Sequence, residues 1–354
     1  MLLNTSLIEN AKPLEITLRT SDVKRLTILD DAKSKNLNNF AQDVCKGLMA
    51  EKKYLSPKYF YDQTGSELFV KITQTEEYYL TQTEKAILNH YSASIVDKCK
   101  QVNLLVELGS GSSEKTDSLL CEFHNKRKTF NYIPIDVSDI IIDSSKKLLE
   151  KYDKLSVTGI LSDYERGLSL VSNVENGAKL ILFLGSSIGN FEPAELEAFL
   201  SMTQKTLDEA DFILIGFDLV KDSDVLNSAY NDAQGITEDF NSNILNRINR
   251  ELDGNFDVNK FAHKAFFNDK LSRIEMHLVS KENQTVTIGE LNTKISFKSG
   301  ESIHTENSHK FTFDMIATYT NNAHLELVKT WTDPKDYFAL CLFRKQQEIQ
   351  DELR

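Results

Sequence analysis

The chain has 354 residues, of which 40% are hydrophobic, and its formal net charge is -12 at pH 7. A chain of this length and composition buries a substantial core and is typical of two domains, or of one large domain with an insertion. The acidic balance argues against a nucleic-acid partner, and because the sequence has neither a basic, apolar leader nor an apolar run long enough to span a bilayer, we expect a cytoplasmic protein without a membrane partner.

The four cysteines lie far apart in the sequence and form no C-x-x-C pair: Cys45, Cys99, Cys121 and Cys341. We therefore expect neither a disulfide framework nor a metal site. The sequence also has no internal repeats or low-complexity segments. This favours a compact enzyme that acts as a monomer on a small molecule.

Residues 1–30 form an N-terminal extension, in which the alternation of PLEITLRTS predicts an edge strand or an arm. A helix is predicted between residues 31 and 51, because apolar side chains recur there at helical spacing. These side chains are Leu37, Phe40, Val44 and Leu48.

The segment from residue 56 to residue 84 is rich in aromatic side chains: Tyr59, Phe60, Tyr61, Phe69, Tyr78 and Tyr79. Such clusters belong more often to a hydrophobic core than to a binding site. A buried tyrosine hydroxyl nevertheless needs a hydrogen-bond partner, and a substrate in a pocket could supply one. Both interpretations stay open at this point.

A helix is predicted from Thr83 to Lys98, and it leads into the stretch around which the chain is organised, residues 104–116. There LLVEL predicts a buried strand, Gly109 and Gly111 predict a tight turn, and the polar residues that follow can start a helix. Glycine lets the backbone approach a ligand closely, and the free N–H groups of a first helical turn attract electron-rich groups. This turn is therefore the predicted cofactor site.

The spacing E-L-G-S-G-S-S indicates which cofactor binds. It lacks the third glycine of the dinucleotide motif and the Gly-Lys-Ser/Thr of a P-loop. Glu107 would repel a pyrophosphate but suits the ammonium group of S-adenosylmethionine. Asp136 and Asp163 end the next two apolar runs, where they are placed to bind a ribose diol and an adenine amino group, and Tyr164 would cover the ring. Each acid alone could equally be a helix cap, but the three together favour S-adenosylmethionine.

Strands and helices alternate through this part of the chain. The predicted strands are residues 104–108, 130–136, 156–161, 180–185 and 212–217. This alternation predicts a parallel sheet with helices on both faces and with ligands at the carboxyl ends of the strands. The fourth strand ends in LGSSIGN, where Asn190 could be a turn residue or could present a donor and an acceptor to a zwitterion.

The alternation stops after residue 222, and residues 223–310 contain a helical segment followed by predicted antiparallel strands. We expect this insertion to form an α+β substrate-binding domain together with residues 31–84. Residues 85–222 form the S-adenosylmethionine-binding domain, and residues 311–354 complete it with a helix and two strands. The predicted fold is α/β, with a Rossmann-like sheet of seven strands, as in class I methyltransferases, whose last strand runs antiparallel.

A series of motifs gives the chain a family resemblance from about Ser56 to Arg344. They are YFYDQTGSELF, EYYLTQTE, VELGSGSSEKT, YIPIDVS, LGSSIGNF, FDLVKD, AYNDAQGIT, FNSNILNRINRELDGNFD, RIEMHL, TENSHKF and WTDPKDYF. With these motifs the chain resembles the histidine-specific S-adenosylmethionine-dependent methyltransferases of ergothioneine biosynthesis. The resemblance implies an enzyme that uses S-adenosyl-L-methionine to methylate the α-amine of free L-histidine, up to the trimethylated product hercynine.

The resemblance also implies the site residues. The cofactor residues are Gly109, Lys115, Asp136, Asp163 and Tyr164. The substrate residues are Tyr61, Phe69, Tyr78, Gly185, Ser187, Asn190, Tyr230, Met276, Glu306 and Ser308. Tyr61 and Asn190 are the catalytic pair, expected near the reacting amine. Asn190 and Tyr230 would hold the α-carboxylate, and Glu306 and Ser308 would receive the imidazole.

The acid at position 306 bears on the choice of substrate. A buried carboxylate suits an imidazole N–H and would be poorly paired by an apolar ring. Met276 would line the same side-chain pocket, so free L-histidine is the predicted substrate. Two alternatives stay open, namely Nα-methylation of another amino acid such as a tryptophan derivative, and a non-catalytic ligand-binding protein on the same fold. The missing third glycine and Glu107 argue against a nicotinamide oxidoreductase.

Overall fold

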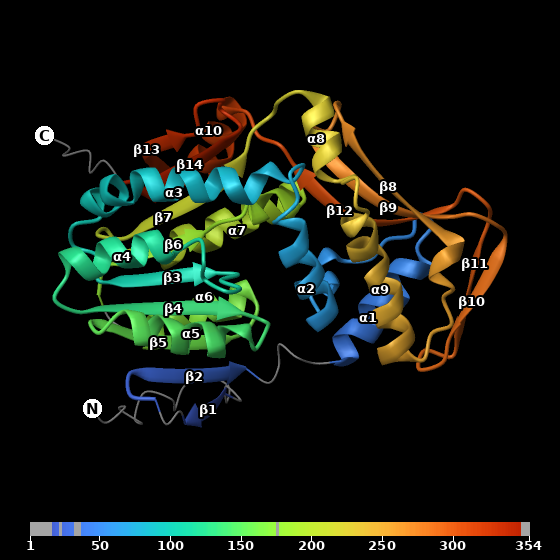
Figure 1. Cartoon of the computed structure of the whole chain (residues 1–354), viewed down its shortest axis with the longest axis horizontal. Coiled ribbons are helices and arrows are strands. Elements are labelled where there is room, and N and C mark those ends of the chain that lie inside the picture. The colour runs from blue at the N-terminus through green and yellow to red at the C-terminus, as the bar shows by residue number, and fades with distance from the viewer. Residues whose placement is uncertain (1–15, 21–22, 32–36, 175–176, 348–354) are drawn as a thin grey trace, which may run out of the picture.

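The computed structural model describes residues 16–20, 23–31, 37–174 and 177–347. Within them a nine-stranded sheet forms one part of the molecule, and a second lobe lies beyond the carboxyl ends of its parallel strands (Figure 1). The strands of the sheet are β1 (Ile16–Thr20), β2 (Leu26–Asp31), β3 (Leu104–Leu108), β4 (Phe130–Asp136), β5 (Leu155–Leu161), β6 (Lys179–Phe183), β7 (Phe212–Asp218), β13 (Leu325–Thr332) and β14 (Phe338–Lys345). Their order is β1-β2-β5-β4-β3-β6-β7-β14-β13.

The centre of this sheet has the predicted topology. Strands β5, β4, β3, β6 and β7 are parallel to their neighbours, and β14 lies antiparallel between β7 and β13. Every residue of β3 and β6 is buried, as expected for strands that helices cover on both faces. The predicted α/β fold, with its seven-stranded core and antiparallel last strand, is confirmed.

Two N-terminal strands extend the sheet from the predicted seven strands to nine. β2 pairs in parallel with β5, and β1 pairs antiparallel with β2 as the edge strand. The Arg166 guanidinium donates to the buried Asp31 carboxylate at 2.8 Å, which ties β2 to the sheet. The edge strand predicted in PLEITLRTS is confirmed for residues 16–20, whereas residues 1–15 and 21 lie outside the described residues.

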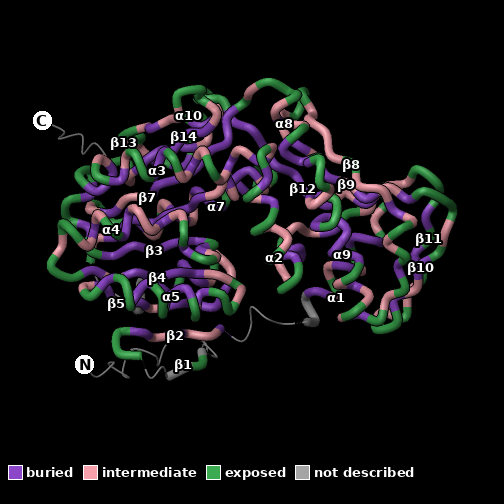
Figure 2. Tube along the Cα trace, viewed as in Figure 1, coloured by how far each residue is buried: buried purple, intermediate pink, exposed green. Residues whose placement is uncertain are grey.

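Helices cover both faces of the sheet. One face packs against α3 (Tyr79–Lys98), α4 (Asp117–Lys126) and α5 (Ile140–Lys151), and the other against α6 (Tyr164–Val174), α7 (Pro193–Thr206) and α10 (Phe313–Asn322). Figure 2 shows the result as buried chain along β3 and along most of β4. Across the described residues, no helix combines the length and the apolar character that crossing a membrane requires.

The second lobe combines helices with a small antiparallel sheet. Its elements are α1 (Leu37–Met49), η2 (Pro57–Phe60), α2 (Gln63–Ile72), α8 (Ser223–Ala229), α9 (Ile236–Leu252), η4 (Val258–Lys260), β8 (Phe261–Asn268), β9 (Arg273–Ser280), β10 (Gln284–Ile288), β11 (Thr293–Phe297) and β12 (Ser302–His309). β12, β9 and β8 form a three-stranded sheet, and β10 pairs with β11. The predicted apolar face of α1 is confirmed for Phe40, Val44 and Leu48, which are buried, whereas the side chain of Leu37 lies outside what the structure describes.

Two distant stretches of chain form one core in this lobe. Its apolar cluster joins side chains from residues 40–80 with side chains from residues 226–303. The backbone N–H of Leu55 also donates to the carbonyl of His304 at 2.8 Å. The lobe is therefore built from the parts of the chain that precede and follow strands β3 to β7.

Candidate active site

A cavity lies where the carboxyl end of the sheet meets the second lobe. Its lining includes every residue predicted to bind substrate. These residues are Tyr61, Phe69, Tyr78, Gly185, Ser187, Asn190, Tyr230, Met276, Glu306 and Ser308. The structure thus brings together side chains from α2, from the loop after β6, from the end of α8 and from strands β9 and β12.

Aromatic rings form one wall of this cavity. Tyr61 contacts Phe69 edge to face at a centroid distance of 5.5 Å, and Tyr78 contacts Tyr230 in the same way at 6.2 Å. Burial raises the pKa of Tyr61 and Tyr78 well above the usual value, so both hydroxyls are neutral. Within the described chain neither hydroxyl has a hydrogen-bond partner, so both are available to a ligand. The aromatic segment therefore supplies both hydrophobic core and part of the cavity lining.

Glu306 reaches the cavity because of a β-bulge. His304 of β12 lies opposite His277 of β9, but the register then shifts, and Glu306 lies opposite Met276. A bulge interrupts the alternation of faces along a strand. Glu306 therefore shares the inner face with Met276, although regular alternation would place it on the same side as His304.

The Glu306 carboxyl is buried but has no hydrogen-bond partner among the described residues. Glu306 is only 8% exposed, and its side chain makes no hydrogen bond within the described residues. Burial raises the pKa of this carboxyl to about 7, and the charge of Lys310 opposes that rise. A buried carboxylate without a partner is costly, and a ligand that donates a hydrogen bond or carries positive charge would compensate it.

We expect Glu306→Gln to stabilise the ligand-free protein by about 1–3 kcal/mol near pH 8. The folded-state pKa of about 7 exceeds the ordinary value of 4.5. Between these values the folded protein binds more protons than the unfolded chain, so the stability from this group falls as the pH rises. Thermal unfolding without ligand near pH 8 and near pH 5 tests this. The gain should shrink at the lower pH, and a variant less stable than wild type near pH 8 would contradict it.

The loop after β6 supplies the polar floor of the cavity. Gly185 and Ser186 have φ values of 80° and 54°, and η3 (Ser187–Asn190) follows. Two consecutive left-handed residues turn the chain sharply, which glycine permits without strain. A Cβ on Gly185 would also lie only 2.9 Å from Nζ of Lys115. The Asn190 amide makes no hydrogen bond within the described residues and faces the cavity.

The glycine turn after β3 and the end of β4 are joined by Asp136. Its carboxylate accepts hydrogen bonds from the backbone N–H groups of Gly111 and Ser138, both at 2.9 Å. Gly109 has a φ of 70°, and a Cβ there would lie 2.8 Å from the hydroxyl of Tyr164. A carboxylate has about four acceptor positions, so Asp136 retains capacity to bind a ribose diol.

The remaining predicted cofactor residues have protein partners of their own. Asp163 accepts from the backbone N–H of Arg166 at 2.9 Å and so caps α6. The ring of Tyr164 packs edge to face on Phe183 at 5.4 Å, and burial raises its pKa. Nζ of Lys115 lies 3.0 Å from Glu84. Tyr164 lies beside the glycine turn, whereas Asp163 is occupied in the way that the helix-cap alternative described.

Glu107 differs from expectation. Its carboxyl is buried and accepts from Thr116 at 2.6 Å and from the hydroxyl of Tyr132. Burial raises its pKa to about 7. The side chain therefore points into the interior and connects β3 to β4 and to the start of α4.

Sequence reasoning missed three buried charges beside the pocket, namely Glu84, Asp218 and Lys310. Glu84 of α3 accepts from the backbone N–H of Gly185 at 2.7 Å and pairs with Lys115, so it links the two glycine loops. Asp218 ends β7. An acid at a strand end was the signal that identified Asp136, and the same signal could have identified Asp218.

We expect Glu84→Gln to lower the free energy of unfolding by about 1–3 kcal/mol, because Gly185 and Lys115 both lose a charged acceptor. The amide keeps the shape of the side chain, so this loss reports hydrogen bonding and charge. Urea denaturation measures it. The control is Glu197→Gln on the exposed surface of α7, which should stay within about 0.5 kcal/mol of wild type. Equal stability of both variants would contradict the linking role of Glu84.

Comparison with known proteins identifies the family. A family model described as "Histidine-specific methyltransferase, SAM-dependent" matches residues 40–345. The chain is 40% identical over 302 residues to the histidine N-alpha-methyltransferase of Mycolicibacterium smegmatis, covering 85% of this chain and 93% of that protein. It is 38% identical over 305 residues to the protein of that name from Mycobacterium tuberculosis, covering 86% and 94%. It is also 32% identical over 260 residues to ergothioneine biosynthesis protein 1 of Schizosaccharomyces pombe, covering 71% of this chain but 33% of that protein.

The geometry agrees with this match. The turn at Gly109 lies beside a strand-end carboxylate, Asp136, that keeps free acceptor positions, and this arrangement fits S-adenosylmethionine. The protein is an enzyme with that cofactor. It belongs to the S-adenosylmethionine-dependent, histidine-specific methyltransferase family.

Proposed function

We propose that the enzyme methylates the α-amine of free L-histidine and repeats the transfer up to the trimethylated product hercynine. The observation that carries the proposal is Glu306, a buried carboxylate that lines the cavity and accepts no hydrogen bond from the part of the chain that the structure describes. An imidazole N–H would pair with it, whereas an apolar ring would leave it unpaired. The names of the two mycobacterial relatives support the same substrate.

The substrate would lie between two groups of polar side chains. Glu306 and Ser308, neighbours on the inner face of β12, would receive the imidazole. Asn190 and Tyr230 would hold the α-carboxylate, and Met276 would pack against the side chain. A ligand held at both ends keeps its amine in one place, which is the condition for an in-line reaction.

The cofactor, when bound, supplies an electrophilic methyl group. We propose that it is held by Gly109, Lys115, Asp136, Asp163 and Tyr164. The amine must be neutral to react, and Tyr61 and Asn190 would orient it with uncharged groups. An amine loses N–H groups as it gains methyl groups, and a neutral hydroxyl or amide tolerates this better than a fixed carboxylate would. Alignment and exclusion of water would then supply most of the acceleration.

We also propose that the enzyme is a cytoplasmic monomer. All four cysteines are free thiols, which is typical of a reducing compartment.

The test is a methyl-transfer assay with the purified full chain, S-adenosylmethionine and each proteinogenic amino acid, followed by mass spectrometry. We expect L-histidine to gain one, two and three methyl groups with a matching amount of S-adenosylhomocysteine. Methylation of tryptophan or of another amino acid, with histidine unchanged, would refute the proposed substrate. A single methyl group at full conversion would refute trimethylation alone.

A further inference from the structure

A buried ion pair lies behind the wall of the cavity that carries Ser308. Lys310 directly follows β12, and Nζ of this lysine lies 2.8 Å from the carboxylate of Asp218 at the end of β7. Both side chains are 0% exposed. Removing two charges from water is costly even when they pair. Neither residue has a role in the proposed reaction as described above.

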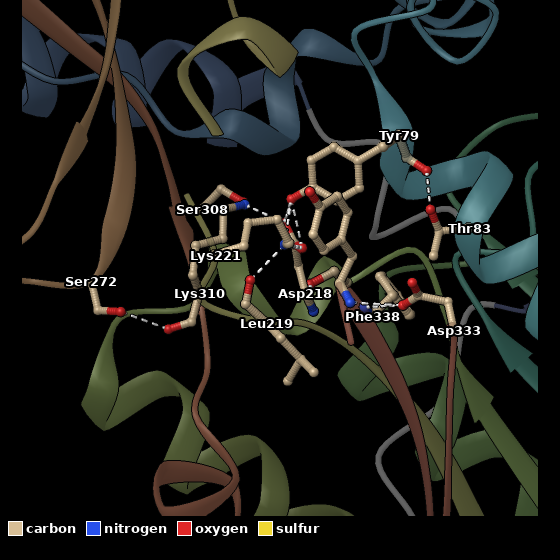
Figure 3. Close-up of polar contacts among 12 residues, drawn as sticks. Tyr79, Thr83, Asp218, Leu219, Lys221, Ser272, Ser308, Lys310, Asp333 and Phe338 are labelled. Atoms are coloured by element: carbon tan, nitrogen blue, oxygen red, sulfur yellow. Dashed lines mark hydrogen bonds and ion pairs between the residues drawn. The ribbon is translucent and has the colours of Figure 1, made fainter. Parts of the chain in front are cut away.

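The three N–H groups of the Lys310 ammonium have three acceptors. Besides Asp218, they are the hydroxyl of Ser308 at 2.7 Å and the hydroxyl of Tyr230 at 3.2 Å. Figure 3 shows Lys310 between Ser308 and Asp218. The ammonium is therefore fully hydrogen-bonded, and two of its acceptors are hydroxyls that line the cavity.

Asp218 is itself held from several sides, which fixes the position of Lys310. Its carboxylate accepts from the hydroxyl of Tyr79 at 2.7 Å, and Lys221 pairs with it as well (Figure 3). Its backbone N–H donates to the hydroxyl of Ser186 at 2.9 Å. The Lys310 ammonium consequently has little freedom to move away from Ser308.

This cation determines how Ser308 can bond to a substrate. In the ligand-free structure the Ser308 oxygen accepts from Lys310 and from the hydroxyl of Tyr230 at 2.8 Å, which occupies both of its lone pairs. A substrate carboxylate would draw the Tyr230 proton to itself, because a charged acceptor forms the stronger bond. Lys310 would still donate to Ser308, and a cationic donor from the substrate on that same oxygen would be repelled. The Ser308 hydroxyl is thereby left to donate.

The groups around the proposed position of the imidazole ring are consistent with Ser308 as a hydrogen-bond donor. Glu306 contributes an acceptor on the same face of β12, and the neutral hydroxyls of Tyr61, Tyr78 and Tyr230 surround it. One acceptor beside one donor matches a neutral imidazole, which has one N–H and one bare nitrogen. An imidazolium has two N–H groups and matches it poorly.

We propose that Lys310 is a positioning residue that makes Ser308 a donor, so that the pocket binds the imidazole as a neutral ring, with its N–H toward Glu306 and its bare nitrogen toward Ser308. This rests on the proposed function, because it takes the ring to be that of histidine.

Nitrogen NMR of ring-labelled L-histidine tests the bound state directly in the wild-type chain. With S-adenosylhomocysteine present to prevent turnover and at about pH 7, we expect one protonated and one unprotonated ring nitrogen. Two protonated nitrogens in the bound ligand would overturn the proposal.

Binding of the two isomers of pyrrolylalanine, each with one ring nitrogen of histidine replaced by C–H, tests the role of Lys310. The better isomer should bind wild type about 10- to 100-fold more weakly than histidine, because Ser308 loses its acceptor. In Lys310→Met the Ser308 hydroxyl is free to donate to Tyr230, so the loss of affinity on replacing histidine by the better isomer should fall to about three-fold or less. The same smaller penalty is expected in Ser308→Ala. Lys221→Met is the matched control, because it removes the other lysine on Asp218 and should keep the wild-type penalty.

A folded Lys310→Met variant that keeps the wild-type penalty would overturn the proposal, and so would a wild-type enzyme that shows no penalty. If Lys310→Met does not fold, the double variant Asp218→Asn, Lys310→Met removes both charges of the pair and is measured instead, while the NMR result decides independently of any variant. Failure of the proposed function would look different, because wild type would then not bind or methylate L-histidine at all.

Discussion

Glu306→Ala should lower kcat/KM for L-histidine by about 100-fold. A hydrogen bond to a charged group contributes about 1.5–3 kcal/mol, and the ring N–H of the substrate would be left unpaired in a buried site. The cavity wall would otherwise persist, because no other residue of the described chain uses the Glu306 carboxyl as an acceptor. The change should raise KM more than it lowers kcat, since the lost contact holds the side chain and not the reacting amine.

The matched control for this variant is Glu301→Ala. Glu301 lies just before β12 and pairs with Lys53 outside the cavity. Its removal should leave kcat/KM within about two-fold of wild type. Unchanged histidine kinetics in Glu306→Ala would contradict the assignment of the imidazole to this carboxylate. A preference for histidine over tryptophan that stays constant would contradict it as well.

Asp136→Ala should raise the Kd for S-adenosylhomocysteine by at least about 100-fold. The carboxylate joins the glycine turn to the end of β4 through two backbone N–H groups, and it keeps acceptor positions for a ribose diol. Asp136→Ala loses both the hydrogen bonds to the ligand and the fixed shape of the turn. The loss of binding free energy should therefore exceed that from one charged hydrogen bond. Asp136→Asn keeps one acceptor oxygen, so its Kd for S-adenosylhomocysteine should lie between those of Asp136→Ala and wild type.

Isothermal titration calorimetry measures both affinities. Asp143→Ala serves as the control, because this residue of α5 is exposed and pairs with Lys146 of the same helix. It should change the Kd by less than about two-fold. An equally small change for Asp136→Ala would show that the strand-end acid is a structural cap and not a ligand of the cofactor.

The sheet could be predicted where the signal was local. Each parallel strand is a short apolar run, and burial on both faces makes such runs continuous. β2 escaped prediction because LTILDD alternates only partly and ends in acids. Its partner β5 is distant in the sequence, and so is Arg166, which pairs with Asp31. Pairing of that kind leaves no mark in a window of a few residues.

The site could be predicted only in part for the same reason. The glycine turn and Asp136 have local signals, whereas Glu306 stands in a polar segment that resembles an exposed loop. It reaches the cavity through a bulge that depends on the register with β9. The task of Lys310 depends on Asp218 and Tyr230, residues of other elements. The family resemblance identified Glu306, but it said nothing about the cation behind Ser308.

The shared core of the second lobe has a consequence for biosynthesis. On the ribosome, α1 and α2 emerge before strands β3 to β7, and all of these strands are translated before β9 and β12 appear. The apolar faces of the two early helices stay without their native partners during that interval. The lining of the cavity is consequently complete only when synthesis has passed Ser308, long after its first aromatic residues have emerged.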